Sequence, residues 1–168
     1  GELENTDSQK VKRLISNNQS QFHPEVYQFQ AAISPHAAAK LENAEIDLTN
    51  MKVPDTNNSL IIEGAGGLMV PLNKNDLVID FIQNLHTPVI LVSRNYLGSI
   101  NHTLLSLEAL QKRNIPLAGI IFNGESNTET ESIIEHYAGV GVLGRVNFEN
   151  EWNKEVVKKY ADQFLSIL

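Results

Sequence analysis

The chain has 168 residues, of which 42% are hydrophobic and 20% charged, as in a globular protein large enough to bury a core. It contains no cysteine, which excludes disulfides, cysteine-based zinc sites and cysteine nucleophiles. The net charge of −7 provides no basic stripe for nucleic acid, and no apolar run is long enough to span a membrane. With a polar start and no signal-peptide pattern, the sequence leads us to expect a cytoplasmic protein with no nucleic-acid or membrane partner.

The first third of the chain reads as short helices joined by irregular segments. Residues 6–8, Thr-Asp-Ser, form a helix start, and apolar residues follow at helical spacing. Residues 16–30 are loop-like. Ser34 and Pro35 then place an N-cap and a first-turn proline ahead of strong helix formers, which predicts a second helix. Residues 45–58 are polar and are expected to form a surface connection.

From residue 59 onward, short apolar runs alternate with amphipathic segments. We predict strands at residues 59–63, 89–92, 117–122 and 140–143, and helices at residues 76–85, 98–110, 127–137 and 151–167. The strand runs lack polar alternation, which is typical of strands covered on both faces. Strand–helix–strand repetition predicts right-handed βαβ units and a mostly parallel sheet with helices on both faces. We expect one α/β domain over residues 1–168.

The most informative segment is the end of the first predicted strand. Glu63 follows three apolar residues, and Gly64, Gly66 and Gly67 follow within four positions. Open α/β sheets bind ligands at the carboxyl ends of their strands, and a carboxylate beside a tight glycine loop suits Mg²⁺ and phosphate oxygens. The alternative is a glycine-rich turn with a solvated glutamate.

Three further places carry both a functional and a structural interpretation. Residues 98–101, Gly-Ser-Ile-Asn, open a helix whose free amides favour an anion such as a carboxylate, or else Ser99 or Asn101 simply caps that helix. Asn123 ends a strand, where its amide could read a purine ring or form an Asn-Gly turn. Asp7 is either a helix cap or a second carboxylate for Mg²⁺.

In order and spacing, the chain from Asn5 to the C-terminus resembles the dethiobiotin synthetase family. The motifs that carry the resemblance are Asn5-Thr-Asp7, Ser34-Pro-His36, Glu63-Gly-Ala-Gly-Gly67 with Pro71-Leu72, Pro88-Val-Ile-Leu-Val92, Leu97-Gly-Ser-Ile-Asn-His102, Ala118-Gly119 leading to Asn123, and Leu143-Gly144. The resemblance implies a three-layer, P-loop-NTPase-like α/β fold and a homodimer with a shared substrate site. It also implies ureido-ring closure from 7,8-diaminononanoate, CO₂ and ATP with Mg²⁺, through a carbamate and a carbamic–phosphoric anhydride.

The resemblance also implies roles for individual residues. Asp7 and Glu63 would be the carboxylates for Mg²⁺ and ATP, and Gly64, Ala65 and Gly66 the loop near the phosphates and the substrate. The base of ATP would be met by Asn123, Gly124, Asn147, Phe148 and Glu149. The substrate carboxylate would be held by Gly98, Ser99, Ile100 and Asn101 across the dimer interface, with Gly66 also contacting the substrate.

The sequence departs from the family at its start. The family begins with a strand, a P-loop ending in Gly-Lys-Thr, a helix and a second strand ending in Lys-Pro, and no Gly-x-x-x-x-Gly-Lys-Ser/Thr motif occurs in these 168 residues. We therefore assign no catalytic residue and expect the chain to be a fragment that alone neither binds ATP tightly nor turns over. Residues 45–58 are short for the helix the family carries there, and Asn147 stands where the family usually has proline.

Two other functions fit the same residues. One is another enzyme of the P-loop class, such as a cobyrinate amidase or a partition ATPase; the motif at residues 97–102 favours the ligase over these. The other is a non-catalytic binding domain without a P-loop, which predicts no response to any nucleotide.

Overall fold

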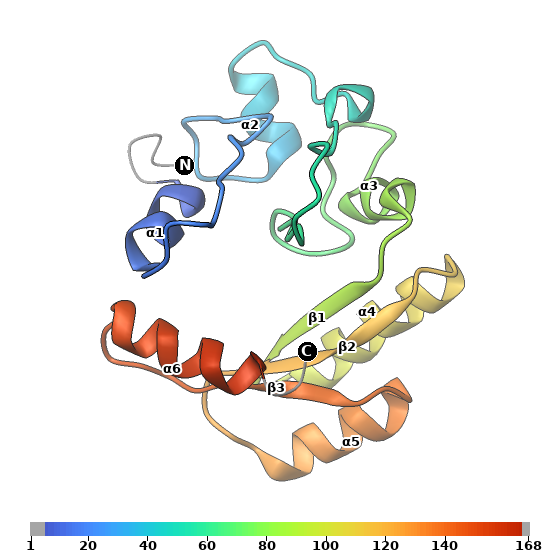
Figure 1. Ribbon diagram of the computed structural model, residues 1–168. Helices are drawn as coiled ribbons and strands as arrows, with labels where there is room; N and C mark the ends of the chain where they lie inside the picture. The colour runs from blue at the N-terminus through green and yellow to red at the C-terminus, as the bar shows by residue number, and fades with distance from the viewer. Residues whose placement is uncertain (1–5, 166–168) are drawn as a thin grey trace. The chain divides into compact units, whose positions relative to one another are not determined.

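The computed structural model describes residues 6–165, so the Asn5 step of the first motif lies outside the described residues. The chain divides into two compact units, the first made of residues 1–13 and 17–85, the second of residues 14–16 and 86–168. Figure 1 shows the elements of each unit, coloured along the chain. The expectation of one domain over residues 1–168 stays a prediction.

The first unit is built from short helices. They are α1 (Asp7–Leu14), α2 (Pro35–Leu41), the 3₁₀ turn η1 (Leu48–Asn50) and α3 (Val78–Leu85). The helix at α1 begins at Asp7, while the hydroxyl of the preceding Thr6 accepts the Gln9 amide at 3.4 Å. Residues of α2, η1 and α3 contribute to a core whose buried members are Ala39, Ile46, Leu72 and Val78, whereas α1 has no buried residue.

The predicted strand at residues 59–63 is wrong. This segment has no regular secondary structure, and Ile61 is 93% exposed. An apolar run forms a strand only where a neighbouring strand accepts its backbone hydrogen bonds, and among the described residues none pairs with this segment. Among its described residues, the first unit has one isolated antiparallel bridge, between Pro71 and Leu77.

The second unit confirms the predicted α/β class. Its strands β1 (Val89–Arg94), β2 (Leu117–Asn123) and β3 (Val142–Val146) form a parallel sheet in the order β1-β2-β3. Helices α4 (Ser99–Lys112) and α5 (Thr128–Ala138) lie on one side of this sheet and α6 (Lys154–Leu165) on the other (Figure 1). Strand β3 begins two residues later than predicted and extends further, because its pairing with β2 starts at Val142.

The core of the second unit sits between β2 and the two helices α4 and α5. Ile120, Phe122 and Ile134 are at most 1% exposed and make a single apolar cluster. Burying three such side chains contributes roughly 5–9 kcal/mol relative to leaving them in water. This cluster fixes β2 in the middle of the sheet and so places the residues at its carboxyl end.

None of the helices within residues 6–165 is long and apolar enough to cross a membrane.

Candidate nucleotide and substrate site

The carboxyl ends of the three parallel strands lie in one row. Asn123, the last residue of β2, pairs with Arg94 of β1 and with Val146 of β3. The Asn123 side-chain amide approaches the Val146 carbonyl at 3.5 Å, and the next amide, that of Gly124, donates to the same carbonyl at 2.8 Å. The carboxamide oxygen of Asn123 accepts no hydrogen bond from the described residues, so this side chain retains an acceptor and most of its donor capacity for a ligand.

The loop that follows Asn123 turns through a backbone conformation that favours glycine. Gly124 has a φ of +89°, where an L side chain is strained. Its carbonyl accepts a hydrogen bond from Arg145 at 3.2 Å, and the Glu125 carbonyl accepts one from Asn95 at 2.9 Å. The loop is thus held from β3 on one side and from the residue after β1 on the other.

Glu131 of α5 is the centre of this network. Its carboxylate accepts hydrogen bonds from the Asn127 amide at 2.8 Å and the Asn95 side-chain amide, and it forms an ion pair with Arg145. The Arg145 guanidinium also lies over the Phe122 ring, 5.8 Å from its centroid. Burial alone would raise the pKa of Glu131, but the Asn127 amide, Arg145 and Asn95 outweigh it and lower this pKa below its ordinary value.

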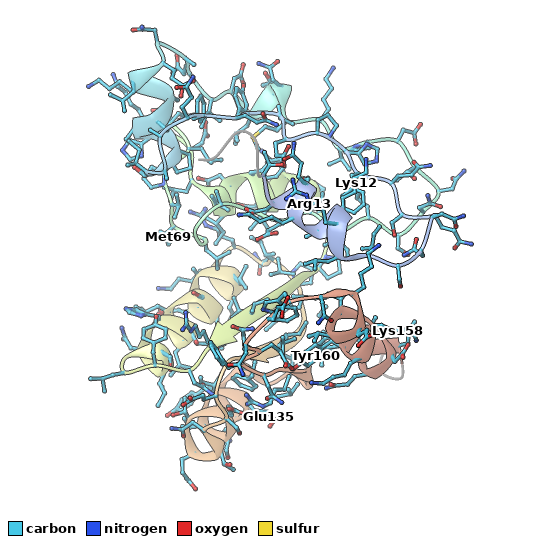
Figure 2. The ribbon with its side chains drawn as sticks, turned by 90° about the vertical axis from the view of Figure 1, so that its left-hand side faces the viewer. Lys12, Arg13, Met69, Glu135, Lys158 and Tyr160 are labelled. Atoms are coloured by element: carbon cyan, nitrogen blue, oxygen red, sulfur yellow. The ribbon has the colours of Figure 1, made fainter. Side chains whose placement is uncertain are left out.

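The loop after β3 is held by α6. The Asn147 amide donates to the hydroxyl of Tyr160 at 3.0 Å, and this hydroxyl donates to Glu149 at 2.5 Å. Lys159 pairs with the same carboxylate at 2.7 Å, and hydrogen bonds from Lys159 and Tyr160 lower the pKa of Glu149. Tyr160 is buried on the side of α6 that faces the sheet, whereas Lys158 lies on its outer side (Figure 2).

The start of α4 carries free hydrogen-bonding groups. Gly98 is the N-cap residue, in a left-handed conformation, and it supplies no side-chain cap. Ser99 is 2% exposed, yet its hydroxyl has no hydrogen-bond partner among the described residues. The Ser99 amide donates to the Tyr96 carbonyl at 3.0 Å, while no bond within the described residues occupies the amides of Ile100 and Asn101. Capping by Ser99, the alternative considered from the sequence, is therefore wrong.

The first unit contains the two predicted metal carboxylates. The Asp7 side chain is 79% exposed and pairs with Lys10 at 3.2 Å, and Glu63 is exposed and has no hydrogen bond to a described residue. Gly66 has a φ of +73° in the tight turn that follows Glu63. No cluster of three or more potential metal-binding side chains occurs within residues 6–165. Each of the two carboxylates is accessible, and Mg²⁺ takes one or two such groups together with phosphate oxygens and water.

Comparison with known proteins decides the family. The sequence profile of the AAA domain family matches residues 1–156. The chain is 49% identical over 164 residues to the ATP-dependent dethiobiotin synthetase BioD of Christiangramia forsetii, covering 98% of this chain and 79% of that protein. It is 52% identical over 160 residues to the protein of the same name from Cytophaga hutchinsonii, covering 95% and 78%. The chain belongs to the dethiobiotin synthetase family.

A bifunctional member extends the comparison. The biotin biosynthesis bifunctional protein BioCD of Bordetella avium is 44% identical over 143 residues, covering 85% of this chain and 31% of that longer protein.

The structure brings together only some of the residues that the dethiobiotin synthetase motifs indicate. Asn123, Gly124 and Asn147 meet at the carboxyl ends of β2 and β3. Residues 98–101 start α4 in the same unit, whereas Asp7 and residues 63–66 belong to the first unit. At Asn147, where the family usually has proline, the backbone amide makes a hydrogen bond to Tyr160 that a proline could not make.

Sequence reasoning missed the residues that hold the two loops. These are Asn95, Glu131, Arg145 and Tyr160. The one available signal was local: Asn127 is followed by Glu131 four residues later, a spacing that lets a glutamate reach back to the start of its helix. The other contacts join positions 11 to 36 residues apart in sequence, which pattern reading does not connect.

Proposed function

We propose that this protein closes the ureido ring of dethiobiotin from 7,8-diaminononanoate, CO₂ and ATP. The observation that carries the proposal is the similarity, over 95–98% of the chain, to proteins named ATP-dependent dethiobiotin synthetase. The strand-end row at Asn123 and the open amides at the start of α4 support it, because they offer one place for a base and one for a carboxylate.

The proposed ring closure takes place in three steps. One amine of the substrate attacks the carbon of CO₂ and loses a proton to give a carbamate. A carbamate oxygen then attacks the γ-phosphorus of ATP, and ADP leaves, so that a carbamic–phosphoric anhydride forms. The second amine attacks the carbonyl carbon of that anhydride, loses a proton and expels phosphate as the ring closes. These steps need positioning and charge neutralisation more than a protein nucleophile.

The residues at the ends of β2 and β3 would bind the base of ATP. The Asn123 carboxamide would read the purine edge, with Gly124, Asn147, Phe148 and Glu149 around the base. Because the Glu149 carboxylate is already bonded to Lys159 and Tyr160, we assign it the role of fixing this loop.

Other residues would bind the substrate carboxylate and Mg²⁺. The amides of Ile100 and Asn101, next to Gly98 and the Ser99 hydroxyl, would hold the substrate carboxylate at the positive end of the α4 dipole. Asp7 and Glu63 would hold Mg²⁺, which supplies charge neutralisation for the phosphates when bound. Gly64, Ala65 and Gly66 would lie close to the phosphates and the substrate.

We extend the proposal to a cytoplasmic homodimer whose partner subunit completes the substrate site. Apolar side chains gather beside the start of α4: Leu97 is fully exposed, Tyr96 is 54% exposed and Ile100 37%. Exposed apolar groups next to a site of this kind suit an interface with a second copy.

The test is a reconstitution with the complete gene product. It is mixed with 7,8-diaminononanoate, bicarbonate, ATP and Mg²⁺, and dethiobiotin and ADP are measured by mass spectrometry. We expect equal amounts of both products and no dethiobiotin when ATP is omitted. ATP consumption without ring formation would favour another P-loop enzyme, and the absence of any nucleotide response would favour a binding domain.

The 168-residue chain is assayed in parallel. Because it contains no Gly-x-x-x-x-Gly-Lys-Ser/Thr motif, we expect these residues alone to bind ATP weakly and to form no dethiobiotin. ATP-dependent ring closure by these residues alone would overturn that expectation.

A further inference from the structure

The loop between β2 and α5 is held by hydrogen bonds to β3, to the residue after β1 and to Glu131 of α5. Residues 124–127 contribute four backbone groups to hydrogen bonds with other elements or with the α5 side chain Glu131. The Gly124 amide bonds to β3, the Gly124 carbonyl to Arg145, the Glu125 carbonyl to Asn95 and the Asn127 amide to Glu131.

All the side chains that make these bonds meet at one carboxylate. Glu131 binds Arg145, Asn95 and the Asn127 amide, and the Arg145 and Glu131 side chains are 21% and 16% exposed. A largely buried ion pair of this kind seldom adds net stability over an apolar pair, so its presence calls for another reason such as fixing a conformation. The three side chains come from β3, α5 and the residue after β1, so the network ties together the carboxyl ends of all three strands.

We propose that Arg145, Glu131 and Asn95 act as positioning residues that fix the Asn123 carboxamide in the orientation needed to discriminate among nucleotide bases. The proposal rests on one part of the proposed function, the assignment of the base of ATP to Asn123. An amide reads a base through one donor and one acceptor, so a rotation or shift of the loop exchanges or removes those bonds. The network opposes this movement because Arg145 holds the carbonyl of Gly124, the residue directly after Asn123, and Asn95 holds the carbonyl of Glu125. The Gly124 amide is held separately, by the main-chain carbonyl of Val146 in β3.

The variants are made in the complete gene product. Arg145→Met and Glu131→Gln each break the ion pair. Arg145→Lys keeps the positive charge but not the planar guanidinium group. The double variant Arg145→Met/Glu131→Gln removes both charges. The matched control is Glu135→Gln, the same change one helical turn later on α5 at an exposed side chain (Figure 2).

The primary readout is the dissociation constant for ATP and for GTP by isothermal titration. We expect ATP binding to weaken about five- to tenfold in Arg145→Met and Glu131→Gln, the scale of one or two lost hydrogen bonds, with GTP binding little changed. The ratio of the ATP dissociation constant to the GTP dissociation constant therefore rises about five- to tenfold, Arg145→Lys gives an intermediate ratio, and Glu135→Gln matches the unmodified protein. In turnover, the KM for ATP should rise while kcat and the KM for the diamine stay within about twofold.

The double variant separates positioning from stability. If each single variant merely leaves a buried charge unpaired, the double variant should restore both the melting temperature and base discrimination. We expect it to recover the melting temperature while base discrimination stays low. Recovery of both, or an unchanged ATP-to-GTP ratio in the single variants, would overturn the proposal.

Hydrogen exchange provides a measurement without nucleotide. The amides of Gly124 and Asn127 should exchange faster in Arg145→Met than in Glu135→Gln, and equal rates would contradict the positioning role. A gene product that binds ATP but forms no dethiobiotin would refute the proposed function while leaving this inference standing. A gene product that binds no nucleotide would refute both.

Discussion

At the scale of single residues, the clearest mark of function is a buried group without a partner. The Ser99 hydroxyl lies at the start of α4 and makes no hydrogen bond with the described residues. A buried hydroxyl left unsatisfied costs about 1–3 kcal/mol, so a sequence selected for stability alone would favour alanine here. Such local costs are expected at ligand sites, where the bound ligand provides the missing bond.

Ser99→Ala should therefore have opposite effects on stability and on substrate binding. We expect the free energy of unfolding to rise by about 1 kcal/mol, because the unsatisfied group is removed, while the KM for the diamine increases several-fold. Chemical denaturation and steady-state kinetics of the complete gene product measure the two. The control is Ser106→Ala on the same helix, whose exposed hydroxyl already donates to the His102 carbonyl at 2.9 Å. A loss of stability in Ser99→Ala would show that the hydroxyl has a structural partner.

The sequence suggests candidate ligand-binding residues, and these stay predictions, whereas the residues that hold their loops carry little recognisable sequence signal. Asn123 stands directly at the end of an apolar run, and residues 98–101 follow the run at residues 89–92 after five intervening residues, both places where the sheet's ligand crevice is expected. Arg145 and Glu131 are ordinary charged residues in sequence, and only the parallel pairing of β2 with β3 brings them together. A salt bridge across elements depends on register, which no short motif encodes.

At the scale of elements, apolar runs predicted strands correctly where the neighbouring strand is also in the second unit. Residues 89–92 and 117–122 became β1 and β2 because each has a parallel partner. The equally apolar residues 59–63 did not, because among the described residues no strand pairs with them. Strand formation thus depends on a neighbouring strand that accepts and donates backbone hydrogen bonds, and a single apolar run does not reveal whether that neighbour exists.

The helix α6 holds the loop after β3 through the Tyr160 hydroxyl and the Lys159 ammonium group. Tyr160→Phe removes the acceptor of the Asn147 amide and the donor to Glu149, so among the described residues the loop at residues 147–149 keeps only the exposed Lys159–Glu149 ion pair as a polar link to α6. We expect ATP binding to weaken several-fold and the lost amide bond to cost about 1 kcal/mol of stability. The control is Tyr137→Phe on α5, where the tyrosine is 66% exposed. Titration calorimetry checks the result, and equal ATP affinity in both variants would exclude a role for this link.

At the scale of the whole molecule, the chain contains two units with different kinds of support. The second has a hydrogen-bonded sheet around Ile120 and Phe122, and the first depends on helices, turns and side-chain bonds. One group of such hydrogen bonds joins the Glu25 carboxylate to residues at the start of α1. Hydrogen bonds from Ser8 and from its own backbone, then from Thr6 and Gln28, lower the pKa of Glu25 to about 2.

This shift predicts how acid acts on the protein. The pKa of Glu25 is about 2 when folded and has an ordinary value of 4.5 when unfolded, so the unfolded state binds the proton first. The stabilisation is complete above pH 4.5 and is lost as the pH falls towards 2. Because the side chain is partly exposed, we expect it to amount to about 1–2 kcal/mol rather than the full value of the shift.

The acid effect is measured by comparing unfolding free energies from urea titrations between pH 6 and pH 3. The unmodified protein should lose stability faster with falling pH than Glu25→Gln, whose neutral amide cannot titrate, so the two curves converge near the acidic end. Glu45→Gln serves as the control, since Glu45 is exposed and makes no hydrogen bond with a described residue. Parallel curves for Glu25→Gln and the unmodified protein would mean that the carboxylate at the start of α1 contributes nothing to folding.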